Sequence, residues 1–304
     1  METFSHEALL YGGLPGFLDG TVPFIREGVE AGEPVLVVVD AEKIALLRDK
    51  FGDAAETVQF ADMAGVGRNP ACIIPAWRGF LDKHAPDGRA VRGIGEPVWA
   101  GRRPAELIES IRHESLLNVA FAGSPFWRLL CPYDVTTLEP EVLGEAFRTH
   151  PTMIQNNRMS RSSAYVDGPP AFDDPLPEPP AYANSIVYNG EDLPMIRRFV
   201  DAQAQTFELS EERCRDLVLS VNELATNSLR YGGGCGMLTV WHEDDELVCE
   251  VRDEGRFVDP LVGRAHPAER PENGRGIWLV NHLCDLVEVR SYATGAVVRV
   301  RMAR

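Results

Sequence analysis

Hydrophobic and polar positions in the first half of the chain form two alternating kinds of segment. Continuous apolar runs are typical of strands covered on both faces, and apolar residues that recur every three or four positions are typical of helices. The pattern predicts strands at residues 34–39, 57–60, 89–95 and 127–133, and helices at 16–31, 41–51, 70–84, 104–119 and 140–148. This alternation predicts an α/β domain with a mostly parallel sheet and helices on both faces.

A different pattern follows in the last third of the chain. It predicts short strands at 185–188, 237–241, 247–252, 286–292 and 296–302, and helices at 193–206, after Ser210 and at 276–284. Ser210 is a good N-cap, and the helix that it begins carries an apolar stripe that ends at Ser228. A long loop rich in glycine, proline and arginine occupies 255–273. We expect an α+β two-layer sandwich with helices on one face of a mixed sheet.

Between these halves, residues 166–183 are dense in proline and acidic side chains. Such a composition is typical of a semi-rigid linker and predicts a segment that does not pack. The sequence therefore predicts a domain at 1–158, a linker at 159–184 and a second domain at 185–304.

Composition and charge narrow the functional classes. The chain has 304 residues, 44% hydrophobic and 25% charged, as in ordinary globular proteins. A net charge of −16 argues against direct nucleic-acid binding, which needs clustered lysine and arginine. Neither a membrane-spanning run nor a signal peptide is visible in the sequence, so we expect a cytoplasmic protein. The six cysteines are scattered and the histidines are widely spaced; we interpret them as reduced core cysteines and as single surface or core histidines.

One helix of the second domain carries Glu223 and Asn227, four residues apart and therefore on one face. The amide oxygen of Asn227 is a ligand that magnesium prefers. Glu223, one turn earlier, is placed to orient or deprotonate an attacking hydroxyl. This pair predicts a site for phosphoryl chemistry.

Further motifs follow in the order that a nucleotide site needs. Asp253 ends a predicted strand and can accept a hydrogen bond from an exocyclic amine, while Gly255 lets the backbone approach a ring. Gly274, Arg275 and Gly276 precede a helix whose first amides can hold phosphate. Each motif is weak alone, but together they predict a site for ATP and magnesium.

Residues 185–303 resemble the ATPase domain shared by gyrase, MutL and histidine kinases, the GHKL superfamily. The branch most similar is that of the anti-sigma-factor serine kinases of the RsbW and SpoIIAB kind, because residues 223–228 match the family's N-box. The resemblance implies that Glu223 is the catalytic base, that Asn227 holds magnesium, that Asp253 and Gly255 bind adenine, and that residues 274–276 form the second glycine box. It also implies an anti-anti-sigma partner with a STAS domain, and a sigma factor as a second partner.

Two departures keep alternatives open. Phe257 stands where the family usually has a glycine, which affects the flexibility expected of the loop over the nucleotide. His150 is followed by Pro151, a poor setting for a phosphoacceptor histidine. A kinase acting on a partner's serine or threonine is therefore favoured over a histidine kinase acting in trans or a module that only binds ATP. The oligomeric state stays open, with a homodimer among the options.

The start of the chain, residues 11–16, has the glycines of a phosphate-binding loop but no following lysine, so we expect no ATP there. Residues 4–155 resemble the MEDS sensory domain (methanogen/methylotroph, DcmR sensory), through the stretches 6–11, 95–99 and 130–134 and Glu114 with Asn118. The resemblance implies a RecA- or KaiC-like fold that senses an unknown small molecule or a protein partner. Residues that could line the sensory pocket are His6, Tyr11, Glu96, Trp99, Glu114 and Tyr133.

Overall fold

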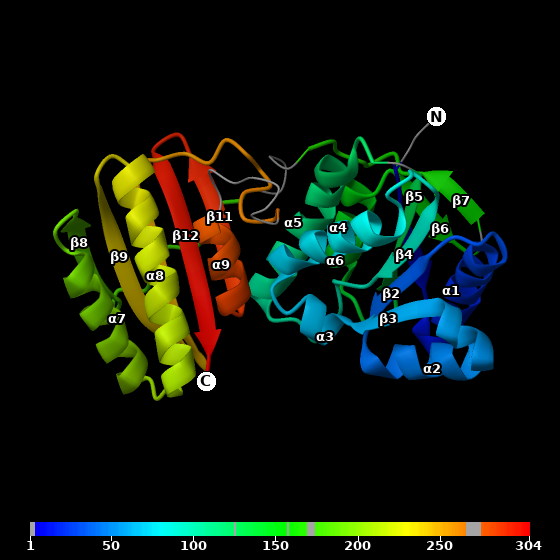
Figure 1. Ribbon diagram of the computed structural model, residues 1–304, viewed down its shortest axis with the longest axis horizontal. Coiled ribbons are helices and arrows are strands. Elements are labelled where there is room, and N and C mark those ends of the chain that lie inside the picture. Colours follow the sequence, from blue (N-terminus) through cyan, green and yellow to red (C-terminus); the bar gives the residue numbers. More distant parts are fainter. Residues whose placement is uncertain (1–3, 125, 157, 169–173, 266–274) are drawn as a thin grey trace. The chain divides into compact units, whose positions relative to one another are not determined.

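The computed structural model describes residues 4–124, 126–156, 158–168, 174–265 and 275–304. Contacts divide the chain into two compact units, Met1–Phe172 and Asp173–Arg304 (Figure 1). Each unit has a sheet of its own, of seven and of five strands. Among the described residues, no helix has both the length and the hydrophobicity that crossing a membrane requires.

The N-terminal unit is an α/β domain, as predicted. Its strands are β1 (Phe4–Tyr11), β2 (Val35–Val39), β3 (Val58–Asp62), β4 (Val91–Gly95), β5 (Trp127–Asp134), β6 (Thr152–Gln155) and β7 (Arg158–Arg161), in the order β3-β2-β4-β5-β1-β6-β7. Its helices are α1 (Gly13–Glu30), α2 (Ala41–Phe51), α3 (Met63–Val66), α4 (Ile73–His84), α5 (Pro104–Phe121) and α6 (Pro140–Thr149), with 3-10 turns at Gly52–Thr57 and Pro70–Cys72. All strand pairs are parallel except β6 with β7.

The apolar pattern missed β1, although this strand lies between β5 and β6 in the sheet. Its early positions, His6 and Glu7, are polar yet almost fully buried. The Glu7 carboxylate is satisfied by Arg128 on β5, with a nitrogen–oxygen distance of 2.9 Å. Partners from other elements allow these polar side chains to be buried. β1 therefore lies inside the sheet although its sequence has no continuous apolar run.

The alternation of side chains along β1 decides which residues can meet. Leu9 and Tyr11 point to one face, where they pack with Phe17 of α1. His6 points to the other face, where it contacts Glu114 of α5. The parallel register pairs Ala8 with Cys131 and Leu10 with Tyr133, so these β5 side chains share the face of His6.

The C-terminal unit is an antiparallel sheet with helices on one face (Figure 1). Its strands are β8 (Asn184–Asn189), β9 (Cys235–Glu243), β10 (Glu246–Asp253), β11 (Leu286–Tyr292) and β12 (Gly295–Ala303), in the order β11-β12-β10-β9-β8, and its helices are α7 (Leu193–Thr206), α8 (Glu211–Tyr231) and α9 (Arg275–Leu283). Every neighbouring pair is antiparallel, so the prediction of a mixed sheet is wrong. Two hairpins lie side by side through β10 and β12, which run in opposite directions.

The hydrophobic core of this unit lies between the helices and the sheet. The apolar stripe of α8, with Leu217, Val221 and Leu224, is buried against strand residues such as Val240 and Val300. Ser210 caps the helix as predicted, because its hydroxyl accepts a hydrogen bond from the backbone N–H of Arg213. The stripe therefore fixes which face of α8 remains for chemistry.

Residues 174–178 pack on the C-terminal sheet, so the prediction that the proline-rich segment does not pack is wrong there. Leu176 is buried. Arg290 donates to the carbonyl oxygen of Asp174 at 2.9 Å, and Arg299 donates to that of Pro177 at 2.6 Å. Buried arginines need acceptors, and a proline-rich segment offers carbonyls that no regular secondary structure uses.

Removal of Glu250 should destabilise the C-terminal unit strongly. Its carboxylate is fully buried and accepts from Arg299, itself 2% exposed, at 2.6 Å. Glu250→Ala leaves a buried guanidinium without its counter-charge, so we expect the free energy of unfolding to fall by about 3–5 kcal/mol. Urea unfolding followed by circular dichroism measures the change.

Glu178→Ala is the matched control, because Glu178 pairs with Arg252 at 3.0 Å but is 77% exposed. This change should alter the free energy of unfolding by less than about 1 kcal/mol. Equal effects of the two substitutions would contradict the role given to the buried pair.

Candidate functional site

Helices α8 and α9 meet at a glycine. Glu223 and Asn227 lie partly exposed on α8, and Gly276 lies in the first turn of α9. A methyl carbon placed on Gly276 would lie 3.1 Å from Asn227 Nδ2 and 3.2 Å from Glu223 Oε2. The absence of a side chain at Gly276 therefore allows the beginning of α9 to lie directly against these two polar groups.

A second contact of α8 fixes the end of β10. The Ser228 hydroxyl donates to Asp253 Oδ2 at 2.5 Å, and the backbone N–H of Gly255 donates to Asp253 Oδ1 at 2.7 Å. Ser228 is fully buried. In the sequence it reads as one more member of the core stripe; the available signal was that a buried hydroxyl needs a partner.

Glycines also crowd around Asp253. A methyl carbon at Gly255 would lie 2.9 Å from the carbonyl oxygen of Tyr231 and 3.2 Å from Gly232 Cα. At Gly232 it would collide with the Asp253 side chain. The backbone of α8's last residues and the turn after β10 therefore touch, and only glycine fits at either position.

This arrangement fits a nucleotide and its metal. Asp253 keeps oxygen lone pairs beyond the two bonds that it accepts, so it can take a further hydrogen bond from an amino group. The Asn227 amide and the Glu223 carboxylate lie one helical turn away, beside the beginning of α9. Arg275 is the exposed first residue of α9, where anions are favoured; Gly274 lies outside the described residues.

The loop after Gly255 is anchored on the sheet before it reaches the α9 region. The backbone N–H of Phe257 donates to Ser291 Oγ at 3.1 Å, and Arg256 donates to the carbonyl oxygen of Ala293 at 2.6 Å. Further along, Asn281 of α9 donates to the carbonyl oxygen of Gly263 at 2.9 Å. Phe257, at the position where the sequence departs from the expected glycine, is therefore held to β11 by a backbone hydrogen bond.

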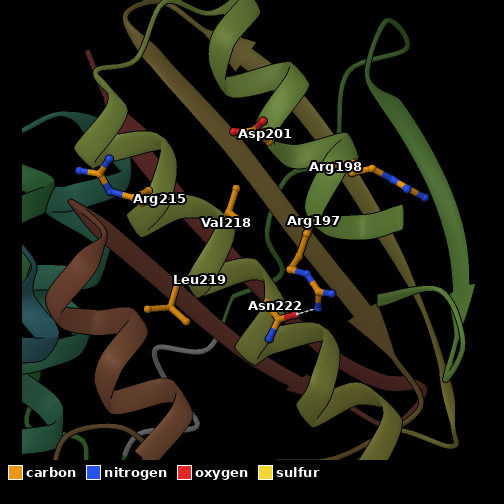
Figure 2. Close-up of a pocket in the computed structure, with 7 residues that line it drawn as sticks. All are labelled: Arg197, Arg198, Asp201, Arg215, Val218, Leu219 and Asn222. Carbon is orange, nitrogen blue, oxygen red and sulfur yellow. Dashed lines mark hydrogen bonds between the residues drawn. The ribbon is translucent and has the colours of Figure 1, made fainter. Parts of the chain in front are cut away.

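A basic groove lies between α7 and α8 (Figure 2). Its lining residues are Arg197, Arg198, Asp201, Arg215, Val218, Leu219 and Asn222. Asn222 precedes Glu223, yet its side chain points to α7 and accepts a hydrogen bond from Arg197 at 2.9 Å. The groove is thus separate from the Asp253–Gly276 region, and it combines three arginines with the exposed Leu219.

The candidate sensory residues lie in different places in the N-terminal unit. His6, Glu114 and Tyr133 share one face of the sheet. Tyr11 donates to Glu96 at 2.6 Å, and Glu96 also pairs with Lys43 at 2.7 Å. Burial holds the pKa of Glu96 above its ordinary value, although the Lys43 ammonium acts in the opposite direction.

Trp99 lies apart from both groups and stacks on Arg102, with 3.8 Å from the guanidinium carbon to the ring centroid. At the beginning of α1 the backbone N–H of Gly13 donates to the Asp134 carboxylate at 3.2 Å. This backbone N–H at the beginning of α1 is therefore already paired with a carboxylate.

Four buried groups lie close together on the face of the sheet that β1 turns toward α5. His6 Nε2 and His150 Nε2 lie 3.0 and 3.2 Å from the same oxygen of Glu114, and Cys131 Sγ lies 3.4 Å from His6 Nε2. The interpretation of these histidines as single residues is wrong, because the two rings are 4.0 Å apart between centroids. Four different elements supply one residue each, so no spacing in the sequence could reveal the cluster.

Burial and mutual contacts together shift the pKa values of His6, Glu114 and Cys131. Burial lowers the pKa of His6, and the neighbouring His150 lowers it further, so the neutral imidazole is favoured. Burial raises the pKa of the Cys131 thiol. Burial also raises the pKa of Glu114, but its contacts with His150 and His6 outweigh this effect and hold the pKa below the ordinary range.

Comparisons with known proteins assign both halves of the chain. The family model for the MEDS domain matches residues 5–151, and the model for the histidine kinase-like ATPase domain matches residues 188–302. No curated protein matches the sequence.

Among solved structures, the RsbU and RsbW domains of Rv1364c from Mycobacterium tuberculosis align at 11% identity and a TM-score of 0.30, covering 41% of this chain and 32% of theirs. The Acinetobacter baumannii histidine kinase AdeS aligns at 9% identity and a TM-score of 0.26, covering 40% of this chain and 67% of its own. The chain thus spans about a third of the first structure. Both TM-scores are too low to establish a shared fold. The two family models carry the assignment: the chain combines a MEDS domain with a histidine kinase-like ATPase domain.

Proposed function

We propose that the C-terminal domain binds ATP with magnesium and phosphorylates a serine or threonine of an anti-anti-sigma partner with a STAS domain. The MEDS domain, with the RecA- or KaiC-like fold that its resemblance implies, would sense a small-molecule signal and control this activity. The same C-terminal domain would also bind and sequester a sigma factor.

One observation supports the proposal more than any other. Helix α8 contacts the beginning of α9 through Glu223 and Asn227, and contacts the end of β10 through Ser228. Three segments that are distant in sequence therefore present an acid, an amide and a helix N-terminus to one region. Gly255 and Gly276 let the turn after β10 and the beginning of α9 lie close to α8, so the three segments surround the region where the nucleotide would bind.

The residues divide the work of phosphoryl transfer. Bound Mg-ATP would supply the transferable phosphoryl group. Asp253, held by Ser228, would accept a hydrogen bond from the adenine amino group, and Asn227 would offer its amide oxygen to the metal. Glu223 would orient the partner's hydroxyl and accept its proton.

The basic groove supports a protein partner with an acidic surface. Arg197 and Arg198 are exposed, and Leu219 of the same groove is 42% exposed. The three arginines of the lining outnumber its one acidic residue, Asp201. In a chain of net charge −16, such a surface favours encounter with a negatively charged partner and supplies apolar area for contact.

Asn227→Ala should abolish ATP turnover, and Glu223→Gln should keep nucleotide binding but lose phosphotransfer. Loss of a direct metal ligand should weaken binding of the Mg-nucleotide at least as much as loss of a second-shell contact does, which is about 10- to 100-fold. Loss of a general base slows transfer by about 100- to 10,000-fold. Titration with mant-ATP measures the first effect, and transfer from labelled Mg-ATP to candidate STAS-domain proteins measures the second.

Asn222→Ala is the control, because this residue lies on the same helix but faces α7; its nucleotide affinity should match that of the wild type. Unchanged turnover in Asn227→Ala would contradict the proposal. Acid-labile phosphate on the chain itself would indicate a histidine kinase. Regulation of the partner without any transfer would indicate a module that only binds ATP.

Charge reversal in the groove should separate partner binding from nucleotide binding. Arg197→Glu combined with Arg215→Glu replaces two attractive charges with repulsive ones, so we expect partner affinity to fall by about tenfold or more. The affinity for mant-ATP should stay unchanged, because neither side chain contacts the Asp253–Gly276 region. Titration calorimetry with the STAS-domain partner measures the loss, and unchanged partner affinity would exclude the groove as a docking surface.

A further inference from the structure

Four potential ligand atoms meet in the interior of the N-terminal domain. They belong to His6 on β1, Glu114 on α5, Cys131 on β5 and His150 at the end of α6, and all lie within 4.8 Å of one another. None of the four residues is more than 2% exposed. Burial of polar groups costs free energy unless they have hydrogen-bond partners or bind an ion.

The outer nitrogens of both imidazoles are already used. Asn118 donates through its Nδ2 to the carbonyl oxygen of Thr149 at 2.8 Å, which leaves Oδ1 to accept from His6 Nδ1 at 3.0 Å. His150 Nδ1 lies 2.9 Å from the carbonyl oxygen of Ala146, which can only accept. Both rings therefore carry their proton on Nδ1, and both Nε2 lone pairs point into the cluster.

Most of the inner atoms are then electron-pair donors. When the imidazoles are neutral, His6 Nε2, His150 Nε2 and a Glu114 oxygen face one another, and the thiol of Cys131, 3.4 Å from His6 Nε2, supplies the one proton among them. His150 Nε2 and Glu114 Oε1 have no hydrogen-bond partner among the described residues. A shared positive centre would satisfy all of these lone pairs at once.

The distances suit a tetrahedral cation. Bonds of about 2.0–2.1 Å to nitrogen and oxygen and about 2.3 Å to sulfur place the ligand atoms about 3.3 Å apart, or about 3.5 Å for a sulfur–nitrogen pair. The observed separations are 3.0 and 3.2 Å for the nitrogen–oxygen pairs and 3.4 Å for sulfur to nitrogen. These three pairs would need only a small expansion, whereas the remaining pairs, up to 4.8 Å apart, would have to move closer together.

From this geometry we propose that His6, Glu114, Cys131 and His150 form a binding site for a divalent transition-metal cation of the zinc class. Two imidazoles, a thiolate and a carboxylate suit a borderline cation, whereas an oxygen-only set would suit magnesium or calcium. Four protein ligands close the coordination sphere, which is typical of structural or cation-sensing sites and not of catalytic ones. The hydrogen bonds to Asn118 and Ala146 orient the two imidazoles, as second-shell contacts do in metal sites.

The site lies beside the segment that leaves the domain. The backbone N–H of Ser162 donates to the carbonyl oxygen of Pro151, next to His150, and its hydroxyl donates to the carbonyl oxygen of Phe147. Val166 donates to Arg148 in the same way. A cation bound to His150 would therefore stabilise residues 147–151, to which residues 162–166 are hydrogen-bonded.

The test uses the full chain, purified without chelator and titrated with zinc or cobalt(II) chloride. We expect about one cation per chain by elemental analysis. The cobalt(II) form should show the absorption of tetrahedral coordination and a thiolate-to-metal charge-transfer band. Cys131→Ser should remove that band. His150→Ala should weaken the affinity at least as much as loss of a second-shell contact does, which is about 10- to 100-fold.

Cys235→Ser and His242→Ala are matched controls, because both residues are exposed in the C-terminal unit; they should leave stoichiometry and spectrum unchanged. Where His150→Ala fails to fold, the cobalt(II) spectrum of the wild type still reports thiolate ligation. A folded wild type that binds no stoichiometric cation, or binding that both substitutions leave intact, would overturn the proposal.

Discussion

The close approach of α9 to α8 at Gly276 is the contact on which the candidate nucleotide site depends. A side chain at this position would place its first carbon 3.1 Å from Asn227 Nδ2 and 3.2 Å from Glu223 Oε2, so either these groups or the beginning of α9 would have to shift. At the other end of the same region, Ser228 ties Asp253 to the buried face of α8. One helix therefore sets both ends of the site, while its apolar stripe fixes its orientation on the sheet.

The alternation of side chains along β1 imposes a comparable constraint on the N-terminal domain. It directs His6 toward α5 and Tyr11 toward α1. The two side chains therefore lie on opposite faces of the sheet and cannot line the same pocket. The buried cluster around Glu114 and the Tyr11–Glu96–Lys43 network are thus separate features of the domain. Each satisfies polar groups that the sheet buries.

Patterns in the sequence predicted the α/β domain, the Ser210 cap and the stripe of α8, because these depend on local periodicity and on residues next to one another in the chain. They missed β1, since His6 and Glu7 are polar residues whose partners come from distant elements. They also missed the packing of residues 174–178, because the arginines that bind these carbonyls lie more than a hundred residues later. The cluster of His6, Glu114, Cys131 and His150 could not be predicted for the same reason, because each of its four residues comes from a different element.

Titration calorimetry of the full chain with a non-hydrolysable ATP analogue, in magnesium and again in excess chelator, tests whether the C-terminal domain holds the nucleotide through its metal. We expect one binding event per chain in magnesium, and markedly weaker binding once the metal is removed. Absence of binding heat under both conditions, with the protein shown to be folded, would contradict it.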